Sequence, residues 1–137
     1  MSGTMGAYSK LLLSVTGVVE AATGLALMLA PALLVQVLLG AAPDSPVGTT
    51  AARVAGAAVF SLAVVCWFAR DDLSGKSAKG LLTAMLFYNF AVVAILALEW
   101  LRTGISGIAL WPVVAGHIAL GAWSLACAVS STRVAGR

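Results

Sequence analysis

Four long apolar stretches follow one another in this chain of 137 residues, and only short polar connections separate them. A helix that crosses the hydrocarbon of a bilayer needs about 20 mainly apolar residues. The four stretches cover approximately residues 10–30, 50–69, 80–101 and 108–130. Because lipid offers no hydrogen bonds to a peptide backbone, each stretch is predicted to be a transmembrane helix.

The composition supports a membrane protein and argues against other classes. Hydrophobic residues make up 61% of the chain and charged residues only 9%, whereas a soluble domain carries about 25% charged residues. The basic residues are scattered, so no nucleic-acid partner is predicted. Cys66 and Cys127 lie in separate apolar segments without a CxxC motif, and they are interpreted as small buried hydrophobes with no metal site.

The short connections predict the fold class, an all-α up-down four-helix bundle that forms one transmembrane domain over residues 1–137. The segment "AAPDSPVGTT" has the composition of a turn and helix cap, "RDDLSGKSAK" that of a solvated loop, and "RTGISG" that of a tight turn. Pro31 is expected to end or kink the first helix. The segment "PALLVQVLLG" is then either a short helix at the outer interface or the end of a longer, tilted first span.

Basic residues near the span ends predict the orientation. Six of them fall on one side of the membrane, and two, Arg53 and Arg102, fall on the other. This distribution predicts that both termini lie in the cytoplasm. The expected location is the inner membrane of a bacterium. The six are Lys10, Arg70, Lys76, Lys79, Arg133 and Arg137. A cleaved signal peptide around "KLLLSVTGVV" is an alternative. However, apolar sequence continues past Ala22, and cleavage would break the charge balance of an even number of spans.

Small residues indicate where helices approach closely, because helices in lipid pack through residues with little side chain. They recur in the first, second and fourth spans, and each group predicts an interface. The groups are Gly17, Ala21 and Gly24, then Ala52, Gly56 and Ala63, and finally Gly116 and Gly121.

Three spans carry their strongest polar residue near mid-depth. These residues are Glu20, Asn89 (beside Tyr88) and His117, and Arg53 is placed to reach toward them from the outer end. A charge at the bilayer centre costs about 2.5–3.5 kcal/mol on insertion scales, so such residues usually face the bundle interior. The matching depths favour one central cluster, which acts as a structural staple or as a site for a ligand or proton. Glu20 is then either neutral and hydrogen-bonded, or ionised beside Arg53 or protonated His117.

Other residues leave alternatives open. His117 is interpreted as a satisfied core residue, a contact to a small molecule, or an axial haem ligand with Met28 or Met85 as the second ligand. Trp123 lies too deep for an interfacial belt and is expected to fill the core or face a ligand. Glu99 and Arg102 have the position of interfacial anchors, and Arg53 has Glu99 as an alternative partner.

The order of these features resembles the broad DoxX-like group of small bacterial four-helix membrane proteins. The resemblance rests on Glu20, "APALL", "ARVAGAAVFSLAVVCWFARDD", "AMLFYNFAVVAILA" and "SGIALWPVVAGHIALGAW", and covers residues 17–128. It implies four spans and an internal polar set of Glu20, Arg53, Tyr88, Asn89 and His117. Some members of the group are linked to thiol redox and membrane quinone chemistry, but a dithiol role would require the CxxC motif that this sequence lacks.

The first functional hypothesis is a non-enzymatic module that binds a lipid-like or isoprenoid molecule, or that serves as an accessory subunit of a larger membrane complex or homo-oligomer. The candidate ligand-binding residues are Glu20, Arg53, Tyr88, Asn89, His117 and Trp123. The second is an intramembrane isomerase or quinone-linked redox enzyme with Glu20 and His117 as its acid–base pair. The third is a proton-linked transporter with a midplane site. The sequence identifies no cofactor or substrate.

Overall fold

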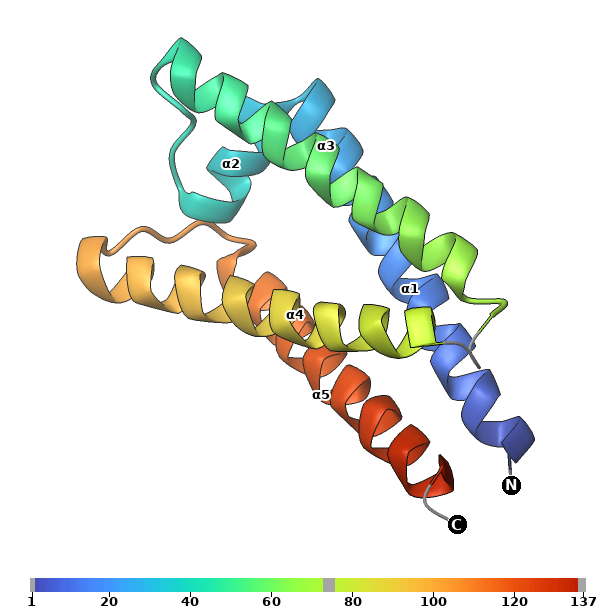
Figure 1. Cartoon of the computed structure of the whole chain (residues 1–137). Coiled ribbons are helices and arrows are strands. Elements are labelled where there is room, and N and C mark those ends of the chain that lie inside the picture. Colours follow the sequence, from blue (N-terminus) through green and yellow to red (C-terminus); the bar gives the residue numbers. More distant parts are fainter. Residues whose placement is uncertain (1, 73–75, 136–137) are drawn as a thin grey trace.

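The computed structural model describes residues 2–72 and 76–135, with side chains described for residues 6–72 and 78–129. The described chain is all-helical, and Figure 1 shows the order of its helices and both termini at the same end. The helices are α1 (Ser2–Leu29), α2 (Pro31–Leu39), α3 (Pro46–Ala69), α4 (Lys76–Thr103) and α5 (Leu110–Ala135).

Four of these helices are long and apolar enough to cross a membrane, so the chain is a multi-pass membrane protein. The candidate spans are Gly6–Leu29, Pro46–Ala69, Ala78–Thr103 and Leu110–Val129. Large side chains such as Leu29, Phe68 and Phe87 are more than 70% exposed, which is the expected arrangement for residues that face lipid. The fourth span, α5, begins at Leu110, two residues later than predicted, and Ile108 lies exposed in the preceding loop.

The helices begin and end at the proline, glycine and serine residues that separate the apolar stretches. The backbone breaks at Ala30, and Pro31 starts α2 as a separate helix, which settles the choice between a short helix and a longer first span. Helix α2 ends at Gly40, whose φ of 89° is accessible to glycine at little steric cost. Ser45 caps α3 by accepting a hydrogen bond from the Gly48 amide at 3.1 Å, and Pro46 occupies the first turn.

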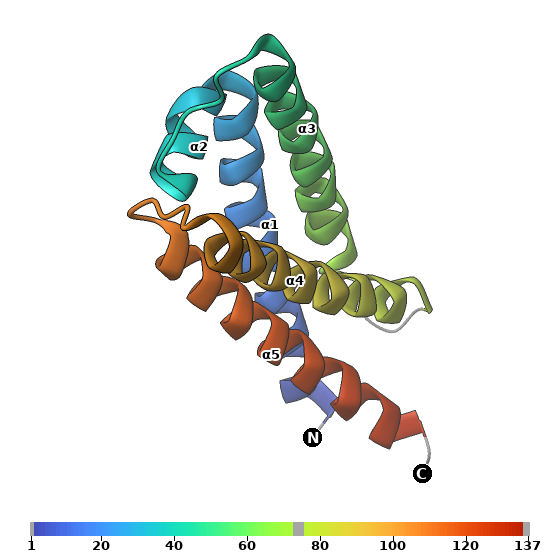
Figure 2. The same cartoon turned by 90° about the vertical axis from the view of Figure 1, so that its left-hand side faces the viewer.

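The long helices form two antiparallel pairs, α1 with α3 and α4 with α5 (Figure 2). The first pair is the tighter one, since Gly24 and Gly56 face each other. A Cβ atom on Gly56 would lie 2.8 Å from the Gly24 carbonyl oxygen, and one on Gly24 would lie 2.7 Å from that of Gly56. Gly17 similarly faces the backbone of Ala63. The small residues of both spans were predicted to lie at interfaces, and the structure shows that these two groups face each other.

The prediction for the fourth span is only half right. Gly121 faces α4, because a Cβ atom there would lie 3.4 Å from the Cβ of Asn89. Gly116 is exposed, and a Cβ atom on it would meet nothing within 4 Å. Its assignment to an interface within this chain was wrong, since it lies on a helix face that no other part of the described chain covers.

The two pairs meet at several levels along the helices. Near the end with the termini, Leu12, Leu13, Cys66, Leu82 and Met85 belong to one apolar core that all four spans share. The pairs diverge toward the other end, where α2 lies between them (Figure 1).

The contact at the end opposite the termini is made by backbone. The carbonyl oxygens of Leu38 and Val37 accept hydrogen bonds from the amides of Gly107 and Ala109 at 3.2 and 3.0 Å. Gly107 is required there, because any Cβ atom would overlap the α2 backbone. The predicted tight turn thus also holds α2.

An exposed ion pair joins the start of α1 to the end of α3. Lys10 Nζ lies 2.6 Å from the carboxylate of Asp71, and Arg70 Nε lies 3.4 Å from the same group. These residues lie at the end with both termini, whereas Arg53 and Arg102 lie near the other end of the helices. Arg137 is outside the described residues, as are the side chains of Lys76 and Arg133.

Replacing Gly56 with alanine is expected to destabilise the protein, because the new Cβ atom would meet Leu27 Cβ at 2.7 Å as well as the Gly24 carbonyl. Overpacking of this kind costs about 1–3 kcal/mol. Unfolding in detergent by a denaturant measures the change. Gly80→Ala is the control, because a Cβ atom there meets nothing within 4 Å. Equal stability of the two variants would contradict the close crossing.

The ion pair at Asp71 predicts a small loss of stability in acid. Its hydrogen bond with Lys10 lowers the pKa of the Asp71 carboxyl below the ordinary 3.8. The stabilisation is therefore present above about pH 3.8 and is lost as the pH falls through the lowered pKa. Asp71→Asn should melt below wild type at pH 7, and the difference should shrink as the pH falls below 3.8. A melting difference that does not shrink in acid would refute the ion pair as its cause.

Candidate polar site

A chain of polar side chains links α1, α4 and α5 close to the middle of their spans. Glu20 in α1 is 2% exposed, and its Oε2 accepts a hydrogen bond of 3.1 Å from the hydroxyl of Tyr88 in α4. The backbones of these two helices do not approach closely. The long tyrosine side chain therefore bridges them, and it joins the two helix pairs at this level.

The series of contacts between polar side chains continues from Tyr88 to His117 in α5. The two rings meet edge to face, with their centroids 5.6 Å apart. On its other side, His117 Nδ1 lies 2.8 Å from Asn89 Oδ1. Glu20, Tyr88, Asn89 and His117 thus form one connected group contributed by three helices, as the matching depths predicted.

The Asn89 amide determines which nitrogen of His117 carries the proton. Asn89 is 1% exposed, and its Nδ2 donates to the backbone carbonyl of Met85, one helical turn earlier, at 2.7 Å. A carbonyl oxygen only accepts, so the amide nitrogen must face Met85 and the amide oxygen must face His117. The hydrogen bond to that oxygen requires a proton on Nδ1, which leaves Nε2 of the neutral ring as an acceptor.

The free nitrogen of His117 is accessible. No hydrogen-bond partner for Nε2 is present among the described residues, and none of their buried side-chain nitrogen or oxygen atoms lacks a partner. Nε2 is therefore not a buried atom. His117 lines a groove of about 240 Å³ between α4 and α5, together with Asn89, Phe90, Val93, Ile118 and four other residues. The site thus offers one polar acceptor in apolar surroundings.

The other predicted site residues lie elsewhere. Arg53 is exposed, and in the described chain it forms no ion pair with Glu20 or Glu99. Trp123 is half-buried and packs against the apolar core. Trp100 and Trp111, at the end opposite the termini, stack edge to face with their centroids 5.1 Å apart.

Some buried polar groups that the sequence analysis did not select are satisfied locally. Ser124 is 1% exposed and donates to the carbonyl of Leu120, four residues earlier. Cys66 Sγ lies 3.4 Å from Met85 Sδ in the core. The sequence analysis also did not predict that the Met85 carbonyl accepts the hydrogen bond from Asn89 Nδ2. Polar side chains in apolar helices commonly bond the carbonyl four residues earlier.

The described residues contain no group of three His, Cys, Asp or Glu side chains placed to hold a metal ion. Met85, one of the two methionines considered as a second haem ligand, is 1% exposed, and its sulfur contacts Cys66. The site consists of two hydrogen-bonded pairs, Tyr88 with Glu20 and His117 with Asn89, which are joined by the edge-to-face contact of the Tyr88 and His117 rings.

Removing the Tyr88 hydroxyl is expected to destabilise the fold. Tyr88→Phe leaves the buried carboxyl of Glu20 without this donor, and hydrogen bonds between membrane helices contribute about 1 kcal/mol. Unfolding in detergent should show this loss. Tyr8→Phe should show none, because Tyr8 is 61% exposed. If Tyr88→Phe costs as much in a Glu20→Leu background as in wild type, the two side chains are not coupled.

Comparison with known proteins identifies no relative of this chain: no family model, no curated protein and no solved structure matches it.

Proposed function

We propose that this multi-pass membrane protein binds a lipid-like molecule in the groove between α4 and α5, with His117 as its polar contact. The observation that carries the proposal is that His117, whose Nε2 has no hydrogen-bond partner in the described chain, lines an otherwise mainly apolar groove. Sites for small hydrophobic molecules commonly combine an apolar lining with a few placed polar groups.

The chemistry of the acceptor narrows the class of ligand. With its proton on Nδ1, the neutral imidazole accepts at Nε2 and cannot donate there. A matching ligand carries a hydroxyl group and an apolar body, as an isoprenoid alcohol or a reduced quinone does. Asn89 contributes by holding the ring in this orientation and tautomer, so it acts as a positioning residue.

The geometry gives less support to acid–base catalysis by Glu20 and His117. Tyr88 lies between them, since it contacts both. Glu20 is buried and is not among the residues that line the groove. A substrate in the groove would reach His117 but would not meet the carboxyl group. The same separation weakens the case for a proton-linked transport path through both residues.

The proposal places the protein in the inner membrane of a bacterium. The excess of basic residues at the end with the termini favours the inner membrane of a bacterium with that end in the cytoplasm, and the DoxX-like resemblance agrees with such a setting. A larger membrane complex or a homo-oligomer is compatible with the exposed apolar surface. In that case a partner helix, rather than a lipid, would be the occupant of the α4–α5 groove.

Native mass spectrometry after extraction in mild detergent tests the proposal. Wild type is expected to carry a defined small molecule that His117→Ala loses, because the acceptor is removed. His117→Gln is expected to retain part of it, since a glutamine side chain also offers an acceptor. Leu29→Ala, an exposed change away from the groove, is the control and should keep the molecule.

Two results would refute this proposal. In one, wild type carries no small molecule and instead stays bound to a protein partner that His117→Ala releases, which would identify an accessory subunit. In the other, all four proteins carry the same molecule in the same amount, which would mean that His117 does not contact it.

A further inference from the structure

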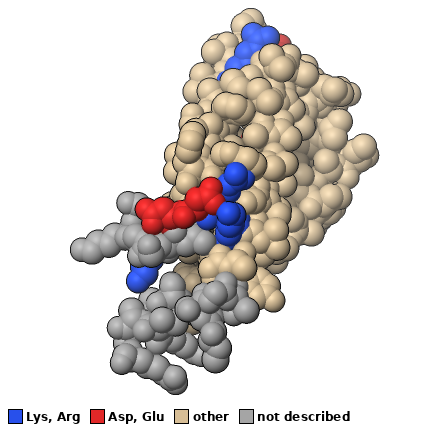
Figure 3. Space-filling view, turned by 90° about the vertical axis from the view of Figure 1, so that its right-hand side faces the viewer, with Lys and Arg blue, Asp and Glu red and all other residues tan. Residues whose placement is uncertain are grey.

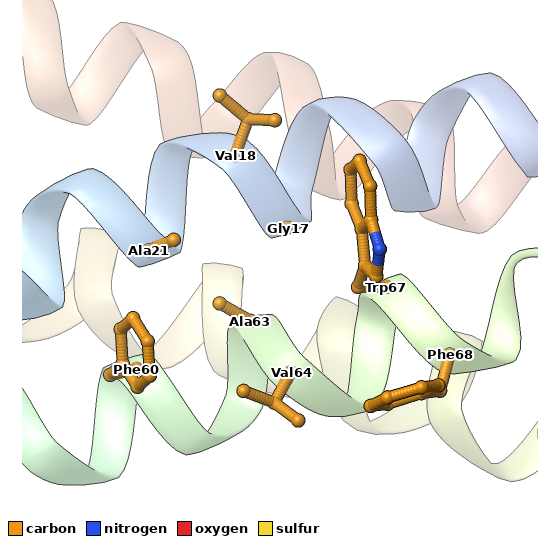
Figure 4. A pocket seen from close by; sticks show the side chains of 8 residues that line it. All are labelled: Gly17, Val18, Ala21, Phe60, Ala63, Val64, Trp67 and Phe68. Carbon is orange, nitrogen blue, oxygen red and sulfur yellow. The ribbon is translucent and has the colours of Figure 1, made fainter.

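A second groove lies on the other helix pair, between α1 and α3. Its volume is about 290 Å³, and all eight residues that line it are apolar. Gly17, Ala21 and Ala63 form its floor, because they have little or no side chain there. Trp67 rises toward α1 near one end and Phe60 lies near the other (Figure 4). The groove is separate from the one at His117, since no lining residue is shared.

The long axis of the groove runs parallel to the helices, as the acyl chain of a lipid would. Phe60 and Trp67 are seven residues apart in α3, which corresponds to about 10 Å along a helix. Phe60 lies near the middle of the span, and Trp67 lies two residues from its end at Ala69. The groove therefore runs along the helix axis from the membrane interior to one interface, as the acyl chain of a phospholipid does.

Two cations stand at the interfacial end of the groove. The guanidinium carbon of Arg70 lies 3.3 Å from the centroid of the Trp67 ring that lines the groove. Arg70 uses Nε for Asp71 at 3.4 Å, and Lys10 also contacts Asp71. Figure 3 shows basic side chains gathered beside acidic ones near this end, next to a broad uncharged face.

Arg70 and Lys10 still have hydrogen-bond donors that a further anion can use. No acceptor for the terminal guanidinium nitrogens of Arg70 is found in the described part of the chain, and the Lys10 side chain is 56% exposed. Asp71 carries one negative charge against the two positive charges that it contacts, and the exposed carboxylate of the next residue, Asp72, adds a second negative charge at this end. A guanidinium group matches the geometry of a phosphate, which binds it through two parallel hydrogen bonds.

We infer that this groove binds one anionic phospholipid, with an acyl chain along α1 and α3 and the phosphate at Arg70 and Lys10. The free donors of Arg70 and Lys10 favour a lipid phosphate over an uncharged partner helix as the occupant. They favour an anionic headgroup over a zwitterionic one, because the cation of a zwitterionic headgroup would lie close to these two cations. The inference does not depend on the function proposed for His117, because it concerns different helices.

Lipid titration followed by native mass spectrometry tests the inference on the full chain in detergent. Phosphatidylglycerol and phosphatidylcholine with the same acyl chains are compared. Wild type is expected to bind one phosphatidylglycerol in preference to phosphatidylcholine. Arg70→Gln should weaken phosphatidylglycerol binding about 5-fold, as expected for one basic residue near an anionic lipid. Arg102→Gln, at the other end of the bundle, should bind like wild type, and His117→Ala should as well.

A second pair of variants tests the groove itself. Val18 lines it and is 59% exposed, whereas the neighbouring Val19 is 46% exposed and does not line it. Val18→Trp should fill the groove and abolish binding of one phosphatidylglycerol, and Val19→Trp should leave it intact. Both positions are open to lipid, so these variants test binding even if Arg70→Gln fails to fold.

The inference is overturned if wild type binds the two lipids equally, or if Arg70→Gln and Arg102→Gln weaken phosphatidylglycerol binding to the same extent. It is also overturned if Val18→Trp instead dissociates a homodimer that Val19→Trp retains. That result would identify a second copy of the chain as the occupant of the groove.

Discussion

A polar side chain inside a membrane helix must find its partner within the protein, and the central part of this structure depends on that constraint. The backbones of α1 and α4 stay apart, yet the Tyr88 hydroxyl reaches the Glu20 carboxyl. His117 and Asn89 extend the same network to α5. Apolar contacts with lipid and with protein are similar in strength. The Tyr88–Glu20 hydrogen bond, together with the backbone hydrogen bonds between α2 and the turn before α5, therefore fixes how the two helix pairs sit against each other.

Small residues provide the second constraint, and they act within the α1–α3 pair. Gly24 and Gly56 bring the two backbones together, while Gly17, Ala21 and Ala63 leave a groove where larger residues of α3 flank the α1–α3 interface. One stripe of small residues thus produces both the closest contact and an open surface. The difference lies in the neighbours, because Phe60 and Trp67 hold space open that shorter side chains would not.

The sequence predicted the spans and the depth of the polar residues, because length and apolar content decide those features. It predicted an end or a kink at Pro31 but left open whether the first span continued beyond it. It also indicated that Glu20, Asn89 and His117 would meet. It did not predict that Tyr88 would stand between Glu20 and His117, or that Arg53 would stay exposed. Those outcomes depend on the rotation of each helix about its axis. In a helix that is apolar all round, no strong periodicity reveals that rotation.

The His117 environment shows how a structural network also prepares a binding group. Every contact from the Met85 carbonyl through Asn89 to His117 Nδ1 satisfies a polar atom that burial would otherwise leave unpaired. The same contacts select one tautomer of the neutral ring, in which Nε2 is the acceptor, and His117 lines the groove. A staple and a ligand site are therefore compatible roles here, because the staple consumes one ring nitrogen and leaves the other available.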